Sequence, residues 1–459
     1  MRPIPYGRQN IKQEDIDAVV ATLKSDFLTQ GPKIKEFEDA FATYIGSKYA
    51  VAVANGTAAL HLCTLALGVK KGDKVITTPI TFAASANCVR YAGGEVVFAD
   101  IDPETYLLDI NEVEKLLKAS PKGTYKGIIP VDFAGRAVDL EAYRKLADEY
   151  GCWIIEDACH APGGYFTDSK GTKHNCGNGD FAELAIFSFH PVKHIAAGEG
   201  GMITTNDEEL YQKLLTLRTH GITKDASLFQ NSPELAIGNS PNDGQRPNDP
   251  MTAKGSNDNQ RPNDARSAND PMTTNDSHRP NDPITTEGQN DARSANDPMT
   301  RKAHNDFPLW YYEMQTLGFN YRLTDFQAAL GLSQLKRADE GLSRRREIAS
   351  VYEQEFSRKP FIKGQSGVVE GHAYHLYIIE IDNRKELYEY LRKYNIFAQV
   401  HYIPVHLMPY YRKFGWKDGD MPMAENYYRN CLSLPMFPSL TTKEQLFVIE
   451  TINKYYENR

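Results

Sequence analysis

The segment from Phe187 to Gly201, FSFHPVKHIAAGEGG, holds the residues with the clearest potential for chemistry. Lys193 stands there among apolar and small residues, where a buried ammonium is costly, so we expect its pKa to fall. A lysine held as a neutral amine can form a Schiff base with a carbonyl cofactor. Ser188 offers a hydroxyl to a phosphate, and the closing glycines let backbone pass close to a bulky group. The alternative is a glycine-rich turn between two strands, with Lys193 reaching solvent.

Residues 49–68 are typical of a strand followed by a small-residue turn and a helix. The strand is YAVAVAN at 49–55, and Gly56, Thr57 and Ala58 lead into the helix. Free backbone amides and the helix dipole favour an anion at such a turn, and Thr57 adds a hydroxyl. The segment predicts a phosphate site; an ordinary strand-to-helix turn is the alternative.

Two further strand ends carry side chains suited to a planar cofactor. Asp157 and His160 emerge from the end of the buried strand that begins with CWII at 152–155. A carboxylate there needs a partner, and a protonated pyridine nitrogen would be one. Phe82 follows the strand at 73–79 and could stack on a ring. The alternatives are a helix-capping role for Asp157 and core packing for Phe82.

These side chains need a sheet whose strands run in one direction. Buried strands alternate with helical segments such as 140–151, which favours a mostly parallel α/β sheet with ligands at the carboxyl ends of its strands. The expected strands include 49–55, 73–79, 95–102, 127–135 and 152–161. Further along, strands at 372–381 and 397–406 alternate with helices, which indicates a smaller α+β domain.

The composition predicts four parts of the chain: a large domain at 1–231, a low-complexity insertion at 232–306, the end of the large domain with a connecting helix at 307–335, and a small C-terminal domain at 336–459. The insertion repeats NDARSANDPMT and RPND and nearly lacks aliphatic and aromatic residues. Such a segment cannot bury enough apolar surface to offset its ordering entropy. We expect a disordered, tolerated surface expansion, with a binding arm as the alternative.

Bulk properties exclude several classes of protein. The formal charge is −8, with 52 Lys and Arg against 60 Asp and Glu, so no nucleic-acid partner is expected. No apolar run is long enough for a membrane span. Scattered cysteines are typical of reduced thiols in a cytoplasm. Five residues could be imagined as a zinc cluster, but their spacing matches no standard site, so no metal is expected; they are Cys152, Cys159, His160, His174 and Cys176.

Six motifs occur in a characteristic order: TQGP at 29–32, NGTAAL at 55–60, EDACHA at 156–161, SFHPVKHIAAGEGG at 188–201, NYRLTDFQAALG at 320–331 and HYIPVH at 401–406. With them the chain resembles the pyridoxal-phosphate sugar aminotransferases of the DegT/DnrJ/EryC1 family. The resemblance covers nearly the whole chain except the insertion. It implies the fold-type I, aspartate aminotransferase-like fold, with a large domain on a mostly parallel seven-stranded sheet and a smaller C-terminal α+β domain.

The resemblance also implies catalytic and cofactor-binding roles. Lys193 would form the Schiff base with pyridoxal 5'-phosphate, Asp157 would bind the pyridinium nitrogen, and His160 would lie near the ring and its 3-oxygen. Phe82 would stack on the ring. The phosphate would be held by Thr57, Ala58 and Ser188.

Other residues are implied to act across a homodimer or on the substrate. Asn320 would reach the phosphate of the neighbouring subunit's cofactor, so each active site would be shared between two chains. The candidates for the nucleotide-sugar groove are Thr29, Tyr321, His401, Tyr402 and His406.

Three longer segments, RTHGITKD at 218–225, WYYEMQTLGFNYRLTD at 310–325 and VHYIPVHLMPYY at 400–411, are similar to the aminotransferases of pseudaminic acid biosynthesis. This implies transfer from L-glutamate to C4 of UDP-2-acetamido-2,6-dideoxy-β-L-arabino-hexos-4-ulose, which gives UDP-4-amino-4,6-dideoxy-N-acetyl-β-L-altrosamine. The alternatives are aminotransferases of the bacillosamine, perosamine or aminoarabinose type. A sugar dehydratase would have His in place of Lys193, and a non-catalytic cofactor-binding regulator would need a DNA-binding element.

Overall fold

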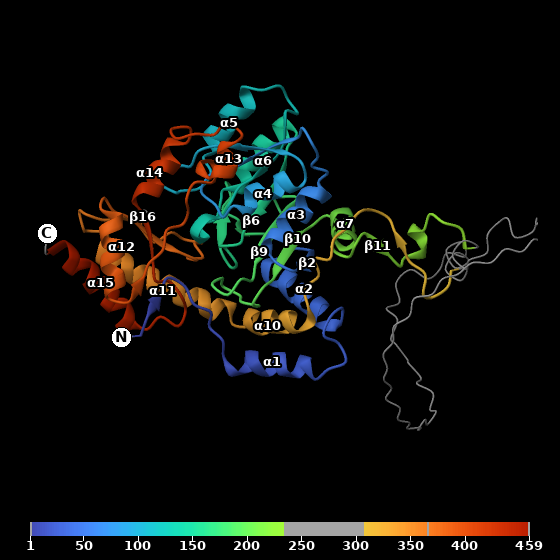
Figure 1. Cartoon of the computed structure of the whole chain (residues 1–459), viewed down its shortest axis with the longest axis horizontal. Coiled ribbons are helices and arrows are strands. Elements are labelled where there is room, and N and C mark those ends of the chain that lie inside the picture. The colour runs from blue at the N-terminus through green and yellow to red at the C-terminus, as the bar shows by residue number, and fades with distance from the viewer. Residues whose placement is uncertain (1, 234–306, 365–366, 458–459) are drawn as a thin grey trace, which may run out of the picture. The chain divides into compact units, whose positions relative to one another are not determined.

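The computed structural model describes residues 2–233, 307–364 and 367–457. The chain separates into a large compact unit, Met1–Ile222 with Met314–Arg459, and a second unit, Thr223–Glu313 (Figure 1). The expected insertion at 232–306 lies outside the described residues except for its first two. In the described part of the second unit, the Glu313 carboxylate accepts hydrogen bonds from the backbone amides of Gln230 and Asn231, at 2.7 and 3.0 Å.

A seven-stranded sheet forms the centre of the large unit. Its strand order is β2-β10-β9-β6-β5-β3-β4, and only β10 runs antiparallel to its neighbours, which confirms the expected mostly parallel sheet. The strands are β2 Tyr49–Val53, β3 Lys74–Thr77, β4 Glu95–Phe98, β5 Tyr125–Ile129, β6 Trp153–Asp157, β9 Leu184–Ser188 and β10 Gly201–Thr205. The parallel strands therefore bring their carboxyl ends to one edge, where the predicted site residues follow them.

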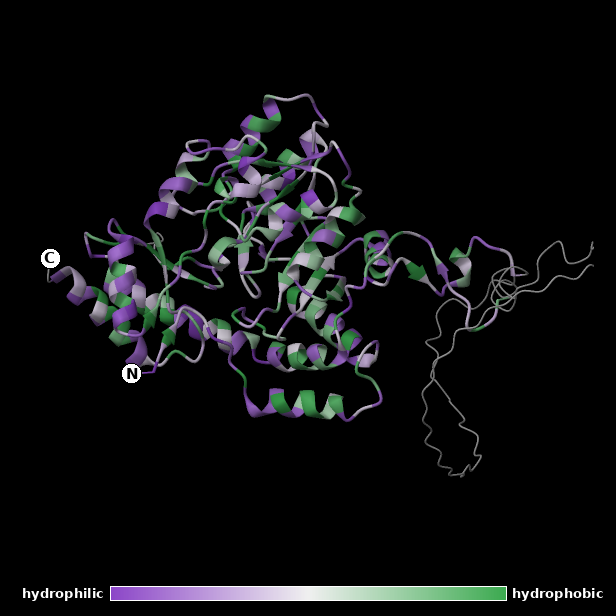
Figure 2. Ribbon diagram, viewed as in Figure 1, coloured by the Kyte–Doolittle hydropathy of each residue, from purple (hydrophilic) through white to green (hydrophobic). Residues whose placement is uncertain are grey.

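Helices cover both faces of this sheet because successive strand residues point to opposite sides. Val51 and Val53 of β2 pack into one hydrophobic cluster, with α3 to α7, while Ala50 and Ala52 pack into another, with α2 and α10. The first layer is α3 Gly56–Ala66, α4 Ala84–Tyr91, α5 Ile110–Lys118, α6 Leu140–Tyr150 and α7 Glu208–Arg218; the second includes α2 Pro32–Ile45 and α10 Asp325–Leu335, beside which lies α1 Gln13–Leu23. Apolar strands in the centre and mixed helices around them are visible in Figure 2.

The C-terminal part has a hydrophobic cluster of its own, which also takes in Ile4 near the N-terminus. It surrounds a three-stranded antiparallel sheet, and β1 pairs with β15 in parallel beside it. The strands are β1 Ile4–Pro5, β13 Lys363–Gly364, β14 Tyr377–Glu380, β15 Ile396–Phe397 and β16 Cys431–Leu434; the helices include α11 Ala338–Phe356, α12 Arg384–Lys393, α14 Pro422–Asn430 and α15 Thr442–Glu457.

The expected strand at 397–406 is largely wrong. Only its first residue belongs to β15, and the chain then turns through a loop into a short 3-10 helix, Val405–Leu407. Pro404 has no amide hydrogen to donate to a ladder, and His401 and Tyr402 turn their side chains toward a cavity. The apolar residues of this segment thus predicted a strand, but the chain forms a loop that places His401 and Tyr402 on the cavity wall.

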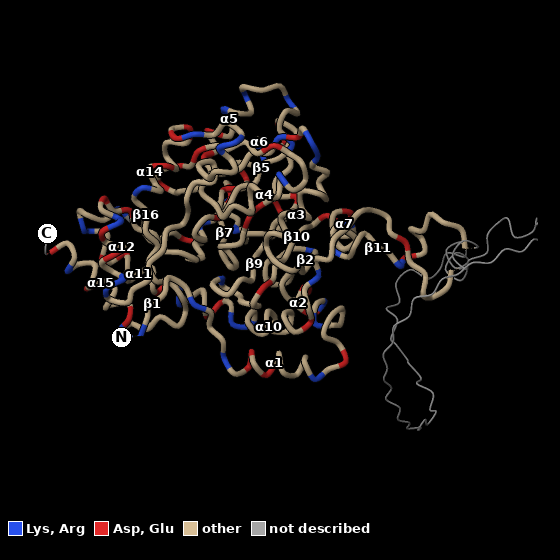
Figure 3. The backbone as a smooth tube through the Cα atoms, in the orientation of Figure 1, with Lys and Arg blue, Asp and Glu red and all other residues tan. Residues whose placement is uncertain are grey.

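Charged residues are distributed over the surface helices with both signs interspersed, in the view of Figure 3. Among the described residues, no helix is both long and apolar enough to cross a membrane.

Candidate functional site

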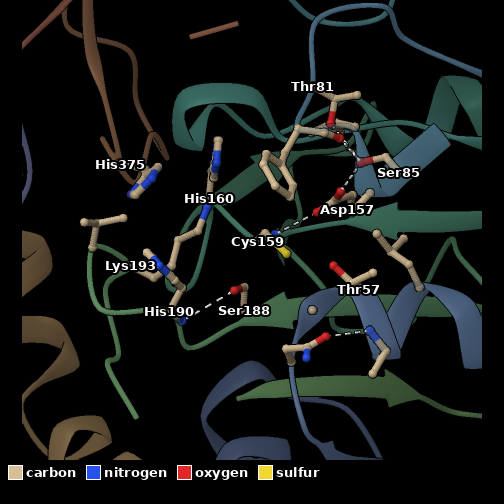
Figure 4. A pocket seen from close by; sticks show the side chains of 18 of the residues that line it. Thr57, Thr81, Ser85, Asp157, Cys159, His160, Ser188, His190, Lys193 and His375 are labelled. Carbon is tan, nitrogen blue, oxygen red and sulfur yellow. Dashed lines mark hydrogen bonds between the residues drawn. The ribbon is translucent and has the colours of Figure 1, made fainter. Parts of the chain in front are cut away.

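A cavity of about 740 Å³ lies at the carboxyl ends of the parallel strands. Its walls come from the residues after β2, β3, β5, β6 and β9, from the loop between β9 and β10, and from the C-terminal part of the chain. Figure 4 shows Lys193, His160 and His375 close together on one side, with Asp157 and Ser85 across from them and Thr57 and Ser188 lower in the view. The sheet topology thus brings residues that are far apart in the sequence into one place.

Lys193 projects into this cavity from the loop that joins β9 to β10, and its backbone amide donates to the carbonyl of His190 at 2.9 Å. Burial lowers the pKa of the Lys193 ammonium, although the nearby Cys159 and Asp157 oppose that shift. Lysine with a lowered pKa supplies more neutral amine near pH 7, which is the form that attacks carbonyl carbons and accepts protons.

Asp157 is the last residue of β6 and is 5% exposed. Its Oδ2 accepts a 2.6 Å hydrogen bond from Ser85 Oγ, and its Oδ1 accepts one from the Cys159 amide at 3.2 Å. Thr81 Oγ1 lies 2.8 Å from Ser85 Oγ. Two donors hold this carboxylate in place at the cavity wall, where it can face a cationic ring nitrogen.

His160 is held by contacts to both of its ring nitrogens. Its Nδ1 accepts the Ala134 amide at 3.2 Å, so the proton of the neutral ring lies on Nε2, which is 3.3 Å from the Tyr402 hydroxyl. Burial, together with the charge of Lys193, moves the pKa of His160 well below its ordinary value. His160 therefore offers a neutral N–H donor.

The N-terminus of α3 lies where the sequence predicts an anion site. Asn55 caps the helix through its side chain, which accepts the Ala58 amide at 2.9 Å, and its carbonyl accepts the Ala59 amide. Within the described chain the Gly56 and Thr57 amides have no such partner. A Cβ on Gly56 would come within 3.1 Å of Ser188 Cβ. Small residues, free amides and two hydroxyls thus fit a phosphate group.

Four further predicted residues line the cavity: Phe82, Tyr321, His401 and Tyr402. The Phe82 ring is 64% exposed, so it is available to cover a planar ligand, and it lies 6.4 Å from the Tyr402 ring. The Tyr321 hydroxyl lies 3.2 Å from His61 Nδ1, and His401 Nδ1 lies 2.9 Å from Ser433 Oγ. These contacts give the cavity a polar and aromatic outer wall.

Three predicted residues do not line the cavity of this chain. Thr29 and Asn320 are exposed and form isolated bridges with Thr324 and Thr219. His406 is fully buried beside Phe98 and its Nε2 lies 3.1 Å from Glu425 Oε1. Because this imidazole cannot reach the cavity, we do not include it in the substrate groove.

Several lining residues escaped prediction: Tyr6, Thr81, Ser85, Tyr91, Cys159 and His375. Thr81 lies in the loop after β3 and Ser85 in the first turn of α4, on either side of Phe82, so the strand-end rule that identified Phe82 could have found them. His375 precedes β14 in the C-terminal part, and nothing in its local sequence says that it meets β6.

The residues considered as a zinc set have separate partners. His174 contacts Asp168 and Asp180, whereas Cys176 lies with Asp132 and Glu156 in a buried group whose ligand-type atoms are all within 4.8 Å of one another.

A sequence profile of the DegT/DnrJ/EryC1/StrS aminotransferase family matches residues 9–240 and 294–453. This chain belongs to that family. Among its relatives, the spore coat polysaccharide biosynthesis protein SpsC of Bacillus subtilis is 35% identical, over 98% of this chain and 96% of that protein. The UDP-4-amino-4,6-dideoxy-N-acetyl-β-L-altrosamine transaminase of Campylobacter jejuni is 32% identical, also over 98% and 96%.

Solved structures of aminotransferases share the whole fold. PseC of Helicobacter pylori, an aminotransferase of pseudaminic acid biosynthesis, superposes with a TM-score of 0.76 at 26% identity and full coverage of both chains. A pyridoxal-phosphate form of a putative sugar aminotransferase from Streptococcus pneumoniae gives 0.74 at 25% identity, covering 99% of each chain. The protein is therefore a pyridoxal-phosphate-dependent sugar aminotransferase of fold type I.

Proposed function

We propose that this aminotransferase transfers an amino group from L-glutamate to C4 of UDP-2-acetamido-2,6-dideoxy-β-L-arabino-hexos-4-ulose. The product would be UDP-4-amino-4,6-dideoxy-N-acetyl-β-L-altrosamine, with 2-oxoglutarate released. The observation that carries the chemistry is the position of Lys193 in one cavity with Asp157 and the α3 anion site. The choice of sugar rests on the 32% identical transaminase of that name and on the likeness to PseC.

The residues have distinct parts in this proposal. Bound pyridoxal phosphate supplies an aldehyde that carries the amino group and a ring that takes up electrons. The Thr57 and Ser188 hydroxyls, with the free amides of Gly56 and Thr57, would hold its phosphate beside Ala58, whose own amide already bonds to Asn55. Asp157 would hold the proton on its ring nitrogen, and Phe82 would cover its ring. His160 donates its Nε2 proton near the ring's 3-oxygen.

Lys193 would hold the cofactor covalently at rest, until the amine of L-glutamate replaces it. The freed, neutral Nζ would take the proton from Cα of L-glutamate in the first half-reaction and pass it to the bound cofactor. In the second half-reaction the same Nζ would take a proton back from the cofactor and deliver it to C4 of the sugar. A lowered pKa suits both steps, since an ammonium could not accept the first proton.

The acceptor is tested with the purified enzyme, L-glutamate and a panel of UDP-linked 4-keto sugars, with products separated by mass and by NMR stereochemistry. We expect the β-L-arabino-hexos-4-ulose to be used at least tenfold more efficiently in kcat/KM than the others. If a bacillosamine-, perosamine- or aminoarabinose-type ketone is turned over faster, that ketone is the acceptor and the proposed one is wrong. SpsC, at 35% identity, is the observation that keeps another polysaccharide sugar in this comparison.

We further propose a homodimer in which Asn320 acts on the partner's cofactor. Asn320 is exposed and outside the cavity of its own chain, and α1 presents an apolar row that a second copy could cover: Ile16, Val20 and Leu23, which are 48%, 40% and 53% exposed. Lys193→Ala and Asn320→Ala proteins should each be inactive or strongly impaired, yet regain activity when subunits are exchanged. Mixed dimers without activity would mean that each site is built from one chain.

Six free cysteines, five of them buried, fit a reducing compartment. We propose that the enzyme works in the cytoplasm.

A further inference from the structure

His375 occupies the cavity wall beside Lys193 and has no role in the chemistry described above. The residue is 4% exposed, and its ring centroid lies 4.3 Å from that of His160, tilted by 36°. Its buried Nδ1 has no hydrogen-bond partner within the described chain. Figure 4 shows the His375 ring directed toward His160 and Lys193. Nδ1 itself is closed off, so the atom that a ligand in the cavity could bind is the other ring nitrogen, Nε2.

The backbone that carries His375 is firmly held. Tyr374, the preceding residue, has a φ of +47°, a left-handed conformation that is unfavourable for a bulky side chain. Its amide donates to His372 Nδ1 at 2.8 Å, and the two rings stack at 3.9 Å. The amides of Ala373 and Leu376 donate to carbonyls of the loop after β5, Gly135 and Ala134. The strained turn therefore fixes the direction of the His375 side chain.

Arg345 of α11 lies behind this turn as a buried cation. It is 1% exposed, and its Nη1 donates to the carbonyls of Tyr374 and His375, both at 3.2 Å, and of Met436 at 2.9 Å. Within the described chain these bonds go to carbonyls and to no carboxylate. Burial lowers the pKa of Arg345 only to about 10, so it stays charged near neutral pH. A buried cation without an anionic partner is costly.

The neighbouring groups that titrate on this wall are kept neutral. Burial and the charge of Lys193 move the pKa of His375 well below its ordinary value, and Arg345 contributes in the same direction. His194 has its pKa lowered in the same way, and its Nε2 lies 2.8 Å from the Ala373 carbonyl. The Nε2 proton of His194 is thus used on the Ala373 carbonyl, whereas the neutral His375 ring lines the cavity with the Arg345 charge behind it, which is an environment suited to an anion.

We propose that His375, backed by the charge of Arg345, is the subsite for a carboxylate of the amino donor. The neutral imidazole donates one hydrogen bond to the carboxylate. The positive charge of Arg345, which is bonded to the His375 backbone carbonyl, attracts the same carboxylate. This inference rests on the proposed function, because it assigns L-glutamate a place beside Lys193. It also assigns the two substrates to different parts of the cavity. The dicarboxylate lies toward His375, and the nucleotide sugar contacts the outer aromatic wall.

The test is a titration of the cofactor-loaded protein with glutarate, which has the two carboxylates of L-glutamate but no amino group. Calorimetry gives its Kd without turnover and without any sugar, so a wrong acceptor sugar would leave the outcome unchanged. We expect His375→Phe, which keeps a ring against His160 but has no donor, to weaken glutarate binding by about tenfold or more, as for a lost hydrogen bond to a charged group. His375→Gln should recover part of the affinity.

Two further variants separate the charge from the fold. Arg345→Met removes the buried cation and should also weaken glutarate, while Arg344→Met, on the same helix but paired with Glu347, should not. The cofactor Kd and the KM for the keto sugar should stay within about threefold of wild type in His375→Phe. Unchanged glutarate binding in His375→Phe, or no glutarate binding by the wild-type protein, would overturn the proposal. Equal losses for glutarate and sugar would make His375 a packing residue for His160 and would overturn it as well.

Discussion

Ser85 Oγ donates a 2.6 Å hydrogen bond to Oδ2 of Asp157, and this bond joins the start of α4 to the end of β6. Since the Ser85 hydroxyl donates its hydrogen bond to the carboxylate, Thr81 Oγ1, at 2.8 Å, must donate to Ser85 Oγ. Ser85 and Thr81 thus form a short chain of hydroxyls that fixes the position of the Asp157 carboxylate. The carboxylate is therefore held in one orientation at the cavity wall, where a ring nitrogen could meet it.

Replacing Ser85 by alanine should slow catalysis without loss of the bound cofactor. A hydrogen bond to a charged group contributes about 1.5–3 kcal/mol, so Ser85→Ala should lower the rate of the L-glutamate half-reaction by about 10- to 100-fold. Stopped-flow absorbance of the loaded enzyme measures this rate. Thr81→Val is the matched control, because it keeps the Ser85 to Asp157 bond and should lose less. A wild-type rate in Ser85→Ala would show that Asp157 does not depend on this donor.

The anion site at α3 should be sensitive to a single methyl group. In Gly56→Ala the new Cβ would lie 3.1 Å from Ser188 Cβ and 3.5 Å from Cys159 Sγ, so the first turn of α3 must shift. We expect the Kd for pyridoxal phosphate, measured by titration of the apoprotein, to rise about tenfold, which corresponds to about 1.4 kcal/mol. Gly341→Ala in α11 meets only Pro438 Cγ, at 3.5 Å, and should bind the cofactor normally. Equal affinities for pyridoxal phosphate in the two variants would show that the phosphate does not bind at the N-terminus of α3.

The sheet and much of the site could be predicted because their signals are local. Lys193, Asp157 and Thr57 each follow a buried strand in the sequence, and the parallel order of those strands brings their ends together. His375 could not be found this way, because its contact with His160 joins residues 215 positions apart. The strand expected at 397–406 failed because the chain leaves β15 after Phe397 and places His401 and Tyr402 on the cavity wall; β16 was not predicted. Long-range packing decides such positions.

Glu156 of β6 and Asp132, which follows β5, form a buried acid pair whose effect on stability depends on pH. Burial raises the pKa of Asp132 to about 6, and burial together with Asp132 raises that of Glu156 well above its ordinary value. A raised carboxyl pKa stabilises the fold fully below the unfolded pKa, near 4, and this contribution is lost as the pH rises through about 6. Asp132→Asn lacks that loss and can offer an amide hydrogen toward Glu156.

Urea unfolding at several pH values measures the effect of this pair. Relative to wild type, Asp132→Asn should gain about 1–3 kcal/mol in free energy of unfolding between pH 4.5 and pH 7.5. Asp17→Asn, at an exposed position of α1, is the control and should show a flat difference. A flat difference for Asp132→Asn too would mean that the pair carries no pH-dependent penalty.

The low-complexity insertion should be dispensable for catalysis. Its composition gives it little apolar surface to pack, and the family profile is interrupted between residues 240 and 294. Replacing residues 234–306 by a short Gly-Ser linker should leave kcat/KM within about twofold, since surface loops change length at little cost in stability. A purified, folded variant that has lost activity would show that the insertion contributes to the site or its assembly.

The absorbance spectrum of the purified protein tests the aminotransferase chemistry at Lys193 most directly. The protein supplied with pyridoxal phosphate should show the visible band of a lysine-linked cofactor, which falls on addition of L-glutamate and returns when the UDP-linked keto sugar is added. Lys193→Ala should lack that band while still binding the cofactor. A wild-type protein with no such band, or a Lys193→Ala variant with the same band and response, would contradict the assignment of Lys193 as the residue that binds the cofactor and moves the proton.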